Sequence, residues 1–337
     1  MIDFRYHLVS IVAVFLALAV GIVLGTTALN GPVLTDLRSR VSGLATDKRS
    51  LEGQVRDLRG QADSGERFAA TVSPTLVAGR LAGDSVLVLS TPGAPTDLRD
   101  ALVSTLRQAG ANVVGRVRLR PEYVAADQAV IDDLVNRLAP PGCPLPTGDV
   151  GVRAAAELSA ALSYPYGGSR VVSADAAQNV VAGFRQAGLL TVDGPDPTPT
   201  SLVAVVAGPA PPRLTDDDRR VAGIELDLLT AFASRGAATV AVGPRASADD
   251  GGLLAALRVD QRAAPVVSGV DNADSSAGRV AAVLALGARR RGEVGQYGVG
   301  RGASALLPTL PTPQPALAPA PQPALAPAPQ PALAPAP

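Results

Sequence analysis

The chain of 337 residues has no tryptophan and one residue each of cysteine, methionine, histidine and lysine. Met1 and His7 both lie in the first seven residues, so the body of the chain can hold neither a Ser-His-Asp or Cys-His catalytic arrangement nor a Cys/His zinc site. A lone thiol, Cys143, excludes an intramolecular disulfide. The formal net charge of zero gives no global attraction to nucleic acid, which is not an expected partner. Without a visible acid/base constellation, we do not expect an enzyme.

An uncharged run, LVSIVAVFLALAVGIVLGTTAL, occupies residues 8–29. As a helix, its 22 residues would span about 33 Å, enough for a hydrocarbon core of about 30 Å. The run is longer than the apolar core of a signal peptide, and Thr26-Thr27-Ala28 is a poor cleavage site. We therefore predict an uncleaved transmembrane helix in preference to a cleaved signal or a buried helix, with residues 1–7 as a short cytoplasmic N-terminus.

A heptad pattern follows over residues 33–64. It predicts a coiled-coil stalk and a homodimer, and the alternative is an amphipathic helix lying on its own domain. A charged residue, Lys48, occupies one a position, where a polar side chain can specify register and a two-stranded state. Gly43, Gly53 and Gly60 weaken the helix. The predicted interface comprises Leu34, Leu37, Val41, Leu44, Lys48, Leu51, Val55 and Leu58.

The body, residues 80–307, alternates short apolar runs with amphipathic segments. This alternation is typical of an α/β fold with a Rossmann-like, mostly parallel, doubly wound sheet. Strands are predicted at 85–90, 111–119, 201–207, 238–242 and 264–270. Helices are predicted from Thr96 as the cap to Gly110, and at 127–138, 151–162, 174–188, 215–234, 253–259 and 275–291.

Residues 308–337 repeat the unit PQPALAPA three times. Such a sequence buries little surface and cannot donate a regular set of backbone hydrogen bonds, which predicts an extended, disordered Pro/Ala-rich tail. Its role is either that of a semi-rigid spacer or that of a passive tail.

The acidic clusters are more typical of helix caps than of cation sites. Asp216, Asp217 and Asp218 follow a capping threonine and predict a capping box. Asp271, Asn272 and Asp274 lack the ligand spacing of an EF-hand, and we expect a helix cap and an Asx-turn there.

Three further features have a structural explanation and also a possible function. Cys143, in a Pro/Gly loop, is the single candidate metal ligand, although a lone thiol is usually incidental. Glycines 295, 298, 300 and 302 surround Tyr297 without a phosphate-loop pattern, which favours close backbone packing. Arg289, Arg290 and Arg291 end a helix, where basic side chains favour the helix dipole, and contact with lipid or cell-wall polymer is the alternative.

A small-molecule site, if the fold carries one, is expected beyond the carboxyl ends of the strands. The residues concerned are Ser90-Thr91-Pro92-Gly93, Gly208 and Gly243.

Several blocks of sequence resemble the actinobacterial MctB family, described as copper-transport outer-membrane proteins. They are MIDFRYHLVSIVAVFLALAVGIVLG at the start, GANVVGRVRL at 110–119, VSGVDNADSSAGRVAAVLAL at 267–286 and GQYGVGRGASALLP at 295–308. The resemblance implies a cell-envelope protein with an extracytoplasmic body and a role in copper efflux or homeostasis. The basic residues flanking the span favour the opposite orientation, so the predicted topology rests on the resemblance.

Copper(I) sites use clustered Cys, Met or His, and a transmembrane β-barrel needs long alternating strands with aromatic girdles. This sequence supplies neither feature. We therefore expect a single-pass cell-membrane protein without a copper site of its own. If copper is bound as a cofactor, Cys143 is the candidate ligand. An outer-membrane location is implied by the family but not by the residues. The alternative function is a dimeric envelope scaffold in cell-wall assembly or division, with an envelope protein or cell-wall partner.

Overall fold

The structure is a computed structural model. It describes residues 4–125, 128–140 and 146–309, with the side chains of all of these except 26–35, 128 and 150. Residues 1–71 and 72–337 form two compact units, which are treated separately below. Cys143 and the predicted tail beyond Thr309 lie outside the described residues.

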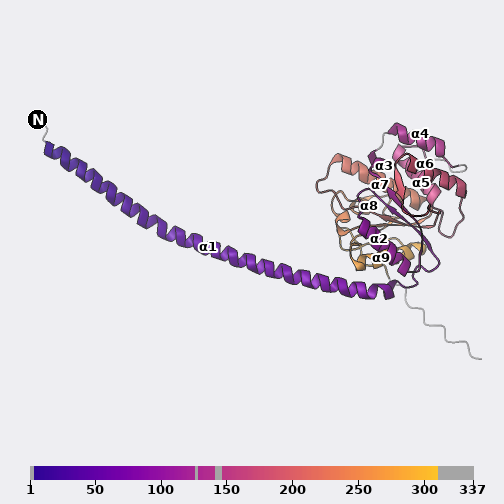
Figure 1. Cartoon of the computed structure of the whole chain (residues 1–337), viewed down its shortest axis with the longest axis horizontal. Helices are drawn as coiled ribbons and strands as arrows, with labels where there is room; N and C mark the ends of the chain where they lie inside the picture. The colour runs from indigo at the N-terminus through magenta and orange to yellow at the C-terminus, as the bar shows by residue number, and fades with distance from the viewer. Residues whose placement is uncertain (1–3, 126–127, 141–145, 310–337) are drawn as a thin grey trace, which may run out of the picture. The chain divides into compact units, whose positions relative to one another are not determined.

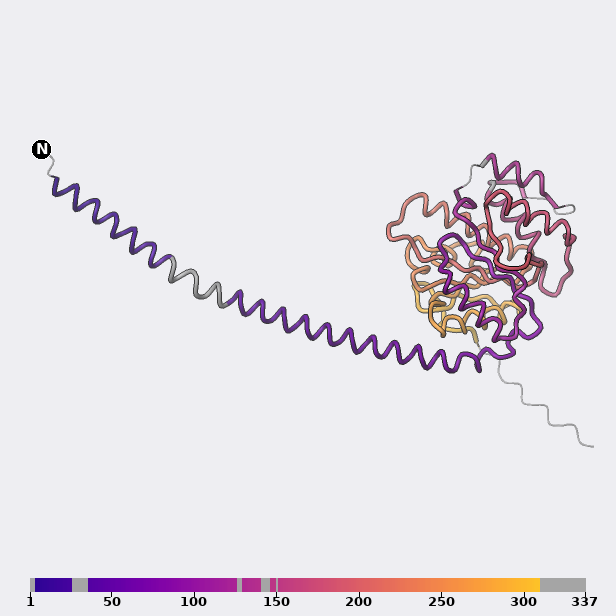
Figure 2. Tube along the Cα trace, in the orientation of Figure 1, coloured from indigo at the N-terminus to yellow at the C-terminus, as the bar shows by residue number. Residues whose placement is uncertain are grey.

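A single helix, α1, runs from Phe4 to Val77. Figure 2 traces this helix on both sides of residues 26–35. Phe4–Gly25 is apolar enough to cross a membrane by length and composition, and none of it is buried. Pro32 and the glycines of the stalk do not end the helix. The predicted coiled-coil segment is therefore helical, and the helix continues beyond residue 64.

The second unit contains a seven-stranded sheet in the order β3-β2-β1-β4-β5-β6-β7. Only the pairing of β2 with β3 is antiparallel among the described pairs. The predicted mostly parallel α/β fold is thus confirmed. The strands are β1 (Ser85–Ser90), β2 (Asn112–Leu119), β3 (Leu190–Val192), β4 (Leu202–Val206), β5 (Ala238–Val242), β6 (Ser268–Val270) and β7 (Gln296–Tyr297).

Helices cover both faces of the sheet, as Figure 1 shows. The helices are α2 (Thr96–Gln108), α3 (Pro121–Ala125), α4 (Gln128–Leu138), α5 (Val150–Leu162), α6 (Ala174–Gln186), α7 (Asp216–Ser234), η1 (Arg245–Ala248), α8 (Leu253–Val259) and α9 (Ser276–Arg290).

Alternate strand residues face two separate apolar cores, because successive side chains of a strand point to opposite faces. Val86 and Val88 of β1 pack with residues of α2 and α9. Leu87 and Leu89 pack with residues of α5, α6 and α7 on the other face. Strands buried on both faces explain the continuous apolar runs in the sequence.

The chain reverses its direction across the sheet between β1 and β4. From β1 it proceeds outward to β2 and β3, and it then returns to pair β4 with the free side of β1. This is the topological switch point of a doubly wound sheet, beyond which ligands bind in such folds.

Two predicted boundaries were wrong. Thr96 is the first residue of α2, and the extended Pro95 occupies the N-cap position without a side-chain hydrogen bond. The strand predicted over 264–270 is confined to Ser268–Val270. The amides of Val266 and Val267 both donate to the carbonyl of Ala263, and this turn keeps the preceding residues out of the sheet.

Candidate functional site

The loops that follow β1 and β4 meet at the switch point. They contain two of the three positions near which a small-molecule site was expected, Ser90-Thr91-Pro92-Gly93 and Gly208. A Cβ atom on Gly208 would lie 3.1 Å from the carbonyl carbon of Gly93. Because a side chain at this position would crowd the Gly93 backbone, a glycine at position 208 favours the close approach of the two loops. The Thr91 amide donates to the carbonyl of Val206 across the same junction, at 2.9 Å.

A cavity of about 180 Å³ opens beside these loops. Its walls come from the loop after β1, the loop after β4, α7 and the start of α8. The lining residues are Pro92, Gly208, Pro209, Pro211, Asp218, Val221, Ala222, Glu225, Gly251, Gly252 and Leu253. Gly243, the third predicted position, is not in this lining and instead packs closely on Ser247.

Glu225 is the most buried ionisable group of the cavity. The residue is only 7% exposed, and burial raises the pKa of its carboxyl to about 7. The nearby Thr91 hydroxyl lowers that pKa in part, but its Oγ1 is buried without a well-formed hydrogen bond, and so is Oγ of Ser90. The loop after β1 therefore holds two buried hydroxyls whose bonding capacity is not fully used by the described residues, and the Thr91 hydroxyl lies beside the Glu225 carboxyl.

Asp218, the second carboxylate of the cavity, also has a structural role. Its backbone amide donates to Oγ1 of Thr215 at 3.2 Å, and its carboxylate accepts from the Thr215 amide at 2.8 Å. These bonds lower the pKa of Asp218. The predicted capping box is thus confirmed, while Asp216 and Asp217 pair with Arg219 and Arg220.

Glu225 was not predicted as a site residue, although the sequence of α7 carries a signal for it. Val221, Glu225, Leu228 and Phe232 follow the helical spacing of one face, and Leu228 and Phe232 are fully buried. A carboxylate on the core face of a helix is uncommon, and one that also lines a cavity is a candidate for a site residue.

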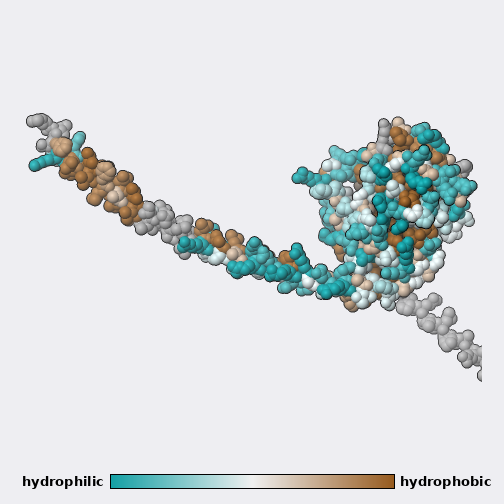
Figure 3. All heavy atoms as spheres, in the orientation of Figure 1, coloured by the Kyte–Doolittle hydropathy of each residue, from teal (hydrophilic) through white to brown (hydrophobic). Residues whose placement is uncertain are grey.

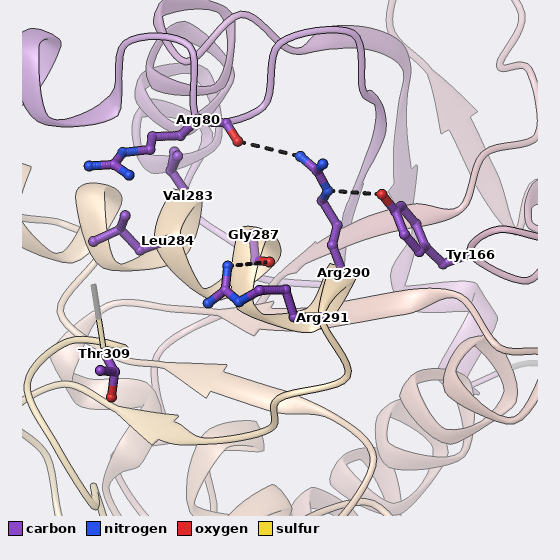
Figure 4. A pocket seen from close by; sticks show the side chains of 8 residues that line it. All are labelled: Arg80, Tyr166, Val283, Leu284, Gly287, Arg290, Arg291 and Thr309. Carbon is purple, nitrogen blue, oxygen red and sulfur yellow. Dashed lines mark hydrogen bonds between the residues drawn. The ribbon is translucent and has the colours of Figure 1, made fainter. Parts of the chain in front are cut away.

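A second cavity, of about 270 Å³, lies against α9 and is lined by arginines. Figure 4 shows Arg80, Arg290 and Arg291 around it, with Tyr166 beside Arg290. Arg290 pairs with Asp84 at 2.5 Å and donates to the Tyr166 hydroxyl at 2.9 Å, and Arg291 pairs with Glu293 at 2.6 Å. These pairings neutralise two of the three guanidinium groups.

The predicted stalk interface is an apolar face of α1. Between Leu37 and Leu58 its large apolar side chains are 44% to 68% exposed. Figure 3 shows hydrophobic patches on the otherwise polar surface of this part of α1. Lys48 reaches Glu52 at 3.7 Å, and the side chain of Leu34 is not described.

Asp271 does not take part in the turn and cap that were expected among Asp271, Asn272 and Asp274. Asp271 is fully buried and pairs with Arg258 at 2.6 Å. It also accepts from the amides of Val299 and Gly300, at 2.7 and 2.9 Å. The turn and cap are formed instead by Asn272 and Ser275, whose hydroxyl accepts from the amide of Gly278. The expected close packing of the glycine loop is confirmed, because a Cβ on Gly298 or Gly300 would clash with Asp271.

Metal-ligating side chains do not cluster in residues 4–125, 128–140 and 146–309: no three His, Cys, Asp or Glu residues there are arranged to hold a metal ion. Cys143, the predicted ligand, lies outside these ranges.

Together these features define a class of protein with one apolar N-terminal helix that is long enough to cross a membrane and a doubly wound α/β domain. Residues 1–308 match the family model described as "Copper transport outer membrane protein, MctB". The chain belongs to this MctB family, which is a copper-transport family and not an enzyme family.

Curated relatives agree with this assignment. The chain is 34% identical to the "Copper transporter MctB" of Mycobacterium tuberculosis (strain ATCC 25618 / H37Rv) over 313 residues, which cover 91% of this chain and 99% of the relative. It is 32% identical, with the same coverage, to the "Copper transporter MctB" of Mycobacterium leprae (strain TN).

Proposed function

We propose that the chain is a single-pass protein of the cell envelope that acts in copper efflux or copper homeostasis, with its α/β domain on the extracytoplasmic side. The observation that carries this proposal is the family match over residues 1–308. The exposed apolar helix Phe4–Gly25 supports the anchor, because its length suits a hydrocarbon core. The family's outer-membrane description is not adopted, since spanning helices are a feature of inner membranes.

The proposed role does not include a copper site within one chain. Copper(I) prefers thiolate and thioether ligands, and the sequence has one cysteine and one methionine. The described carboxylates do not compensate, since no group of three ligands forms among them. We therefore propose that copper is handled through a partner, or at a site shared between subunits.

The stalk is proposed to pair with a second copy of the chain. The apolar face between Leu37 and Leu58 would otherwise stay in contact with water, and pairing in a coiled coil removes it. Helix α1 continues for about 70 Å between residue 25 and residue 71 at 1.5 Å per residue. A paired helix of that length is a spacer.

Total cell copper under copper load tests the function. A strain that lacks the gene is expected to accumulate copper, and the full-length gene is expected to restore the wild-type amount. Complementation by the Cys143→Ser variant is expected to be complete. Failure of that variant alone would make the thiol a ligand and would contradict the absence of a copper site in the chain.

Unchanged copper in the deletion strain would refute the copper role. It would support the alternative of a dimeric scaffold in cell-wall assembly or division, for which the exposed apolar face of the stalk is the favouring observation. Crosslinking in cells would then identify the envelope partner.

The single thiol gives a direct test of topology. A membrane-impermeant maleimide should label Cys143 in intact cells if the domain is extracytoplasmic, and the Cys143→Ser variant should stay unlabelled. In that background, an Asp3→Cys thiol should be labelled only after lysis. The reverse pattern would overturn the proposed orientation, and labelling of broken cells shows that each thiol can react.

A further inference from the structure

We propose that the cavity at the switch point binds a compact organic ammonium ion, with the Glu225 carboxylate as its counter-ion. The inference is independent of the copper role, because it rests on the chemistry of the cavity alone.

Glu225 lacks a cationic partner within the described part of the chain. The two arginines that precede it on α7, Arg219 and Arg220, already pair with Asp216 and Asp217. A buried carboxylate without a counter-ion is costly, and burial raises the pKa of Glu225 to about 7. A cation in the cavity would hold the group ionised and remove that cost.

The remaining walls select an organic cation with an apolar body. Pro92, Pro209 and Pro211 have no amide hydrogen to offer, and Val221, Ala222 and Leu253 are apolar. The two charged side chains of the lining, Glu225 and Asp218, are both acidic. A phosphate or carboxylate ligand would be repelled by this pair.

The volume of the cavity further limits which ligands it can hold. Pockets for drug-sized ligands occupy roughly 300 to 1,000 Å³, whereas this cavity has about 180 Å³. A dinucleotide, the common ligand of doubly wound sheets, does not fit. A hard metal ion would find two carboxylates where six or more oxygen ligands are usual. A short primary amine in its protonated form fits both the volume and the charge.

The test uses the full-length protein in detergent micelles and measures the midpoint of thermal unfolding, which a ligand of the folded state raises. Methyl-, ethyl-, propyl- and butylammonium chloride are the probes, with sodium chloride and the matching alcohols as controls. We expect a saturable rise with at least one ammonium ion and none with its alcohol or with the sodium salt.

Variants then locate the site. Glu225→Gln should weaken the apparent affinity at least ten-fold, and Glu157→Gln should leave it unchanged because Glu157 is a fully buried carboxyl outside the cavity lining. Should Glu225→Gln fail to fold, Ala222→Leu fills the cavity while keeping the carboxyl, and it should abolish the rise.

Three results would overturn the proposal. The first is an unfolding midpoint that no ammonium ion raises, and the second is an equal rise with the matching alcohol. The third is an affinity for the ammonium ion that is the same in the Glu225→Gln and Ala222→Leu variants as in the wild type. A rise that depends on Glu225 with copper(II) chloride, but not with the ammonium ions, would identify a metal site and would equally refute it.

Discussion

Oδ2 of Asp271 lies 2.6 Å from Nη2 of Arg258, and the two side chains are 0% and 3% exposed. The pair joins the carboxyl end of β6 to α8. Arg258 also donates to the carbonyls of Tyr297 and Arg301, at 3.0 and 2.6 Å. One buried ion pair therefore fixes the glycine-rich loop to two elements of the domain.

Asp271→Ala should destabilise the α/β domain by about 3 to 5 kcal/mol, because it leaves a buried guanidinium without its counter-charge. Two loop amides lose their acceptor as well. Urea unfolding of the full chain measures the change. The matched control is Asp250→Ala, whose pair with Arg301 spans 3.5 Å and is more than 80% exposed; it should cost no more than about 0.5 kcal/mol. Equal losses in the two variants would contradict the assigned role of Asp271.

Gly300→Ala should destabilise the same loop. A Cβ there would lie 2.5 Å from Cβ of Ala248 and 2.9 Å from Oδ2 of Asp271, which is too close for either contact. We expect a loss of about 1 to 3 kcal/mol, typical of overpacking. Gly287→Ala in α9 is the control, since a Cβ there meets nothing within 4 Å, and it should be neutral or stabilising by up to about 1 kcal/mol. The prediction fails if thermal unfolding does not separate these two alanine variants.

Glu157 should make the domain less stable as the pH rises. Both of its carboxylate oxygens are buried without a partner, and burial raises the pKa from 4.5 to about 8. The folded state therefore holds the Glu157 proton more tightly than the unfolded state does. The stability that this group contributes is fully present below pH 4.5 and is lost as the pH rises to about 8. Glu157→Gln should consequently gain more than about 1 kcal/mol over the wild type between pH 5 and pH 8. Unfolding curves measured at pH 5 and at pH 8 test this. An equal difference in unfolding free energy between the variant and the wild type at the two pH values would refute the expectation.

Polar substitution of the stalk face should separate the proposed dimer. In the heptad pattern Leu44 and Leu51 occupy d positions, so Leu44→Gln with Leu51→Gln removes two layers of the predicted interface. The sedimentation mass of the full chain should fall from dimer to monomer. Thr46→Gln with Arg49→Gln changes the outer face of the same helix and should leave the mass unchanged. An unaltered mass in the leucine double variant would refute pairing through the stalk.

Much of the fold follows from periodicity in the sequence. The segment from Asp216 to Ser234 was predicted as a helix because an acid-rich cap precedes a regular apolar stripe, and that segment is helical. The apolar runs at 85–90 and 238–242 are strands with the predicted bounds. These elements are specified locally, by caps and by side-chain spacing.

Elements that depend on distant partners could not be predicted. The three residues of β3 form a strand because β2 offers them an edge, and two residues form β7 beside β6 for the same reason. Asp271 shows the same limit at a polar position: its partner Arg258 is 13 residues away, on another element. For the cavity, the loops at the ends of β1 and β4 were predicted from topology, whereas Glu225 is recognised only once α7 lies against them.

Both edge strands of the sheet are short. The outermost strands, β3 and β7, have three and two residues, so each presents few unpaired backbone groups to another chain. Short edge strands of this kind discourage edge-to-edge aggregation. Any partner that recognises the domain would thus have to do so by side-chain contact with its helices and loops, because extension of the sheet by an added strand would be disfavoured.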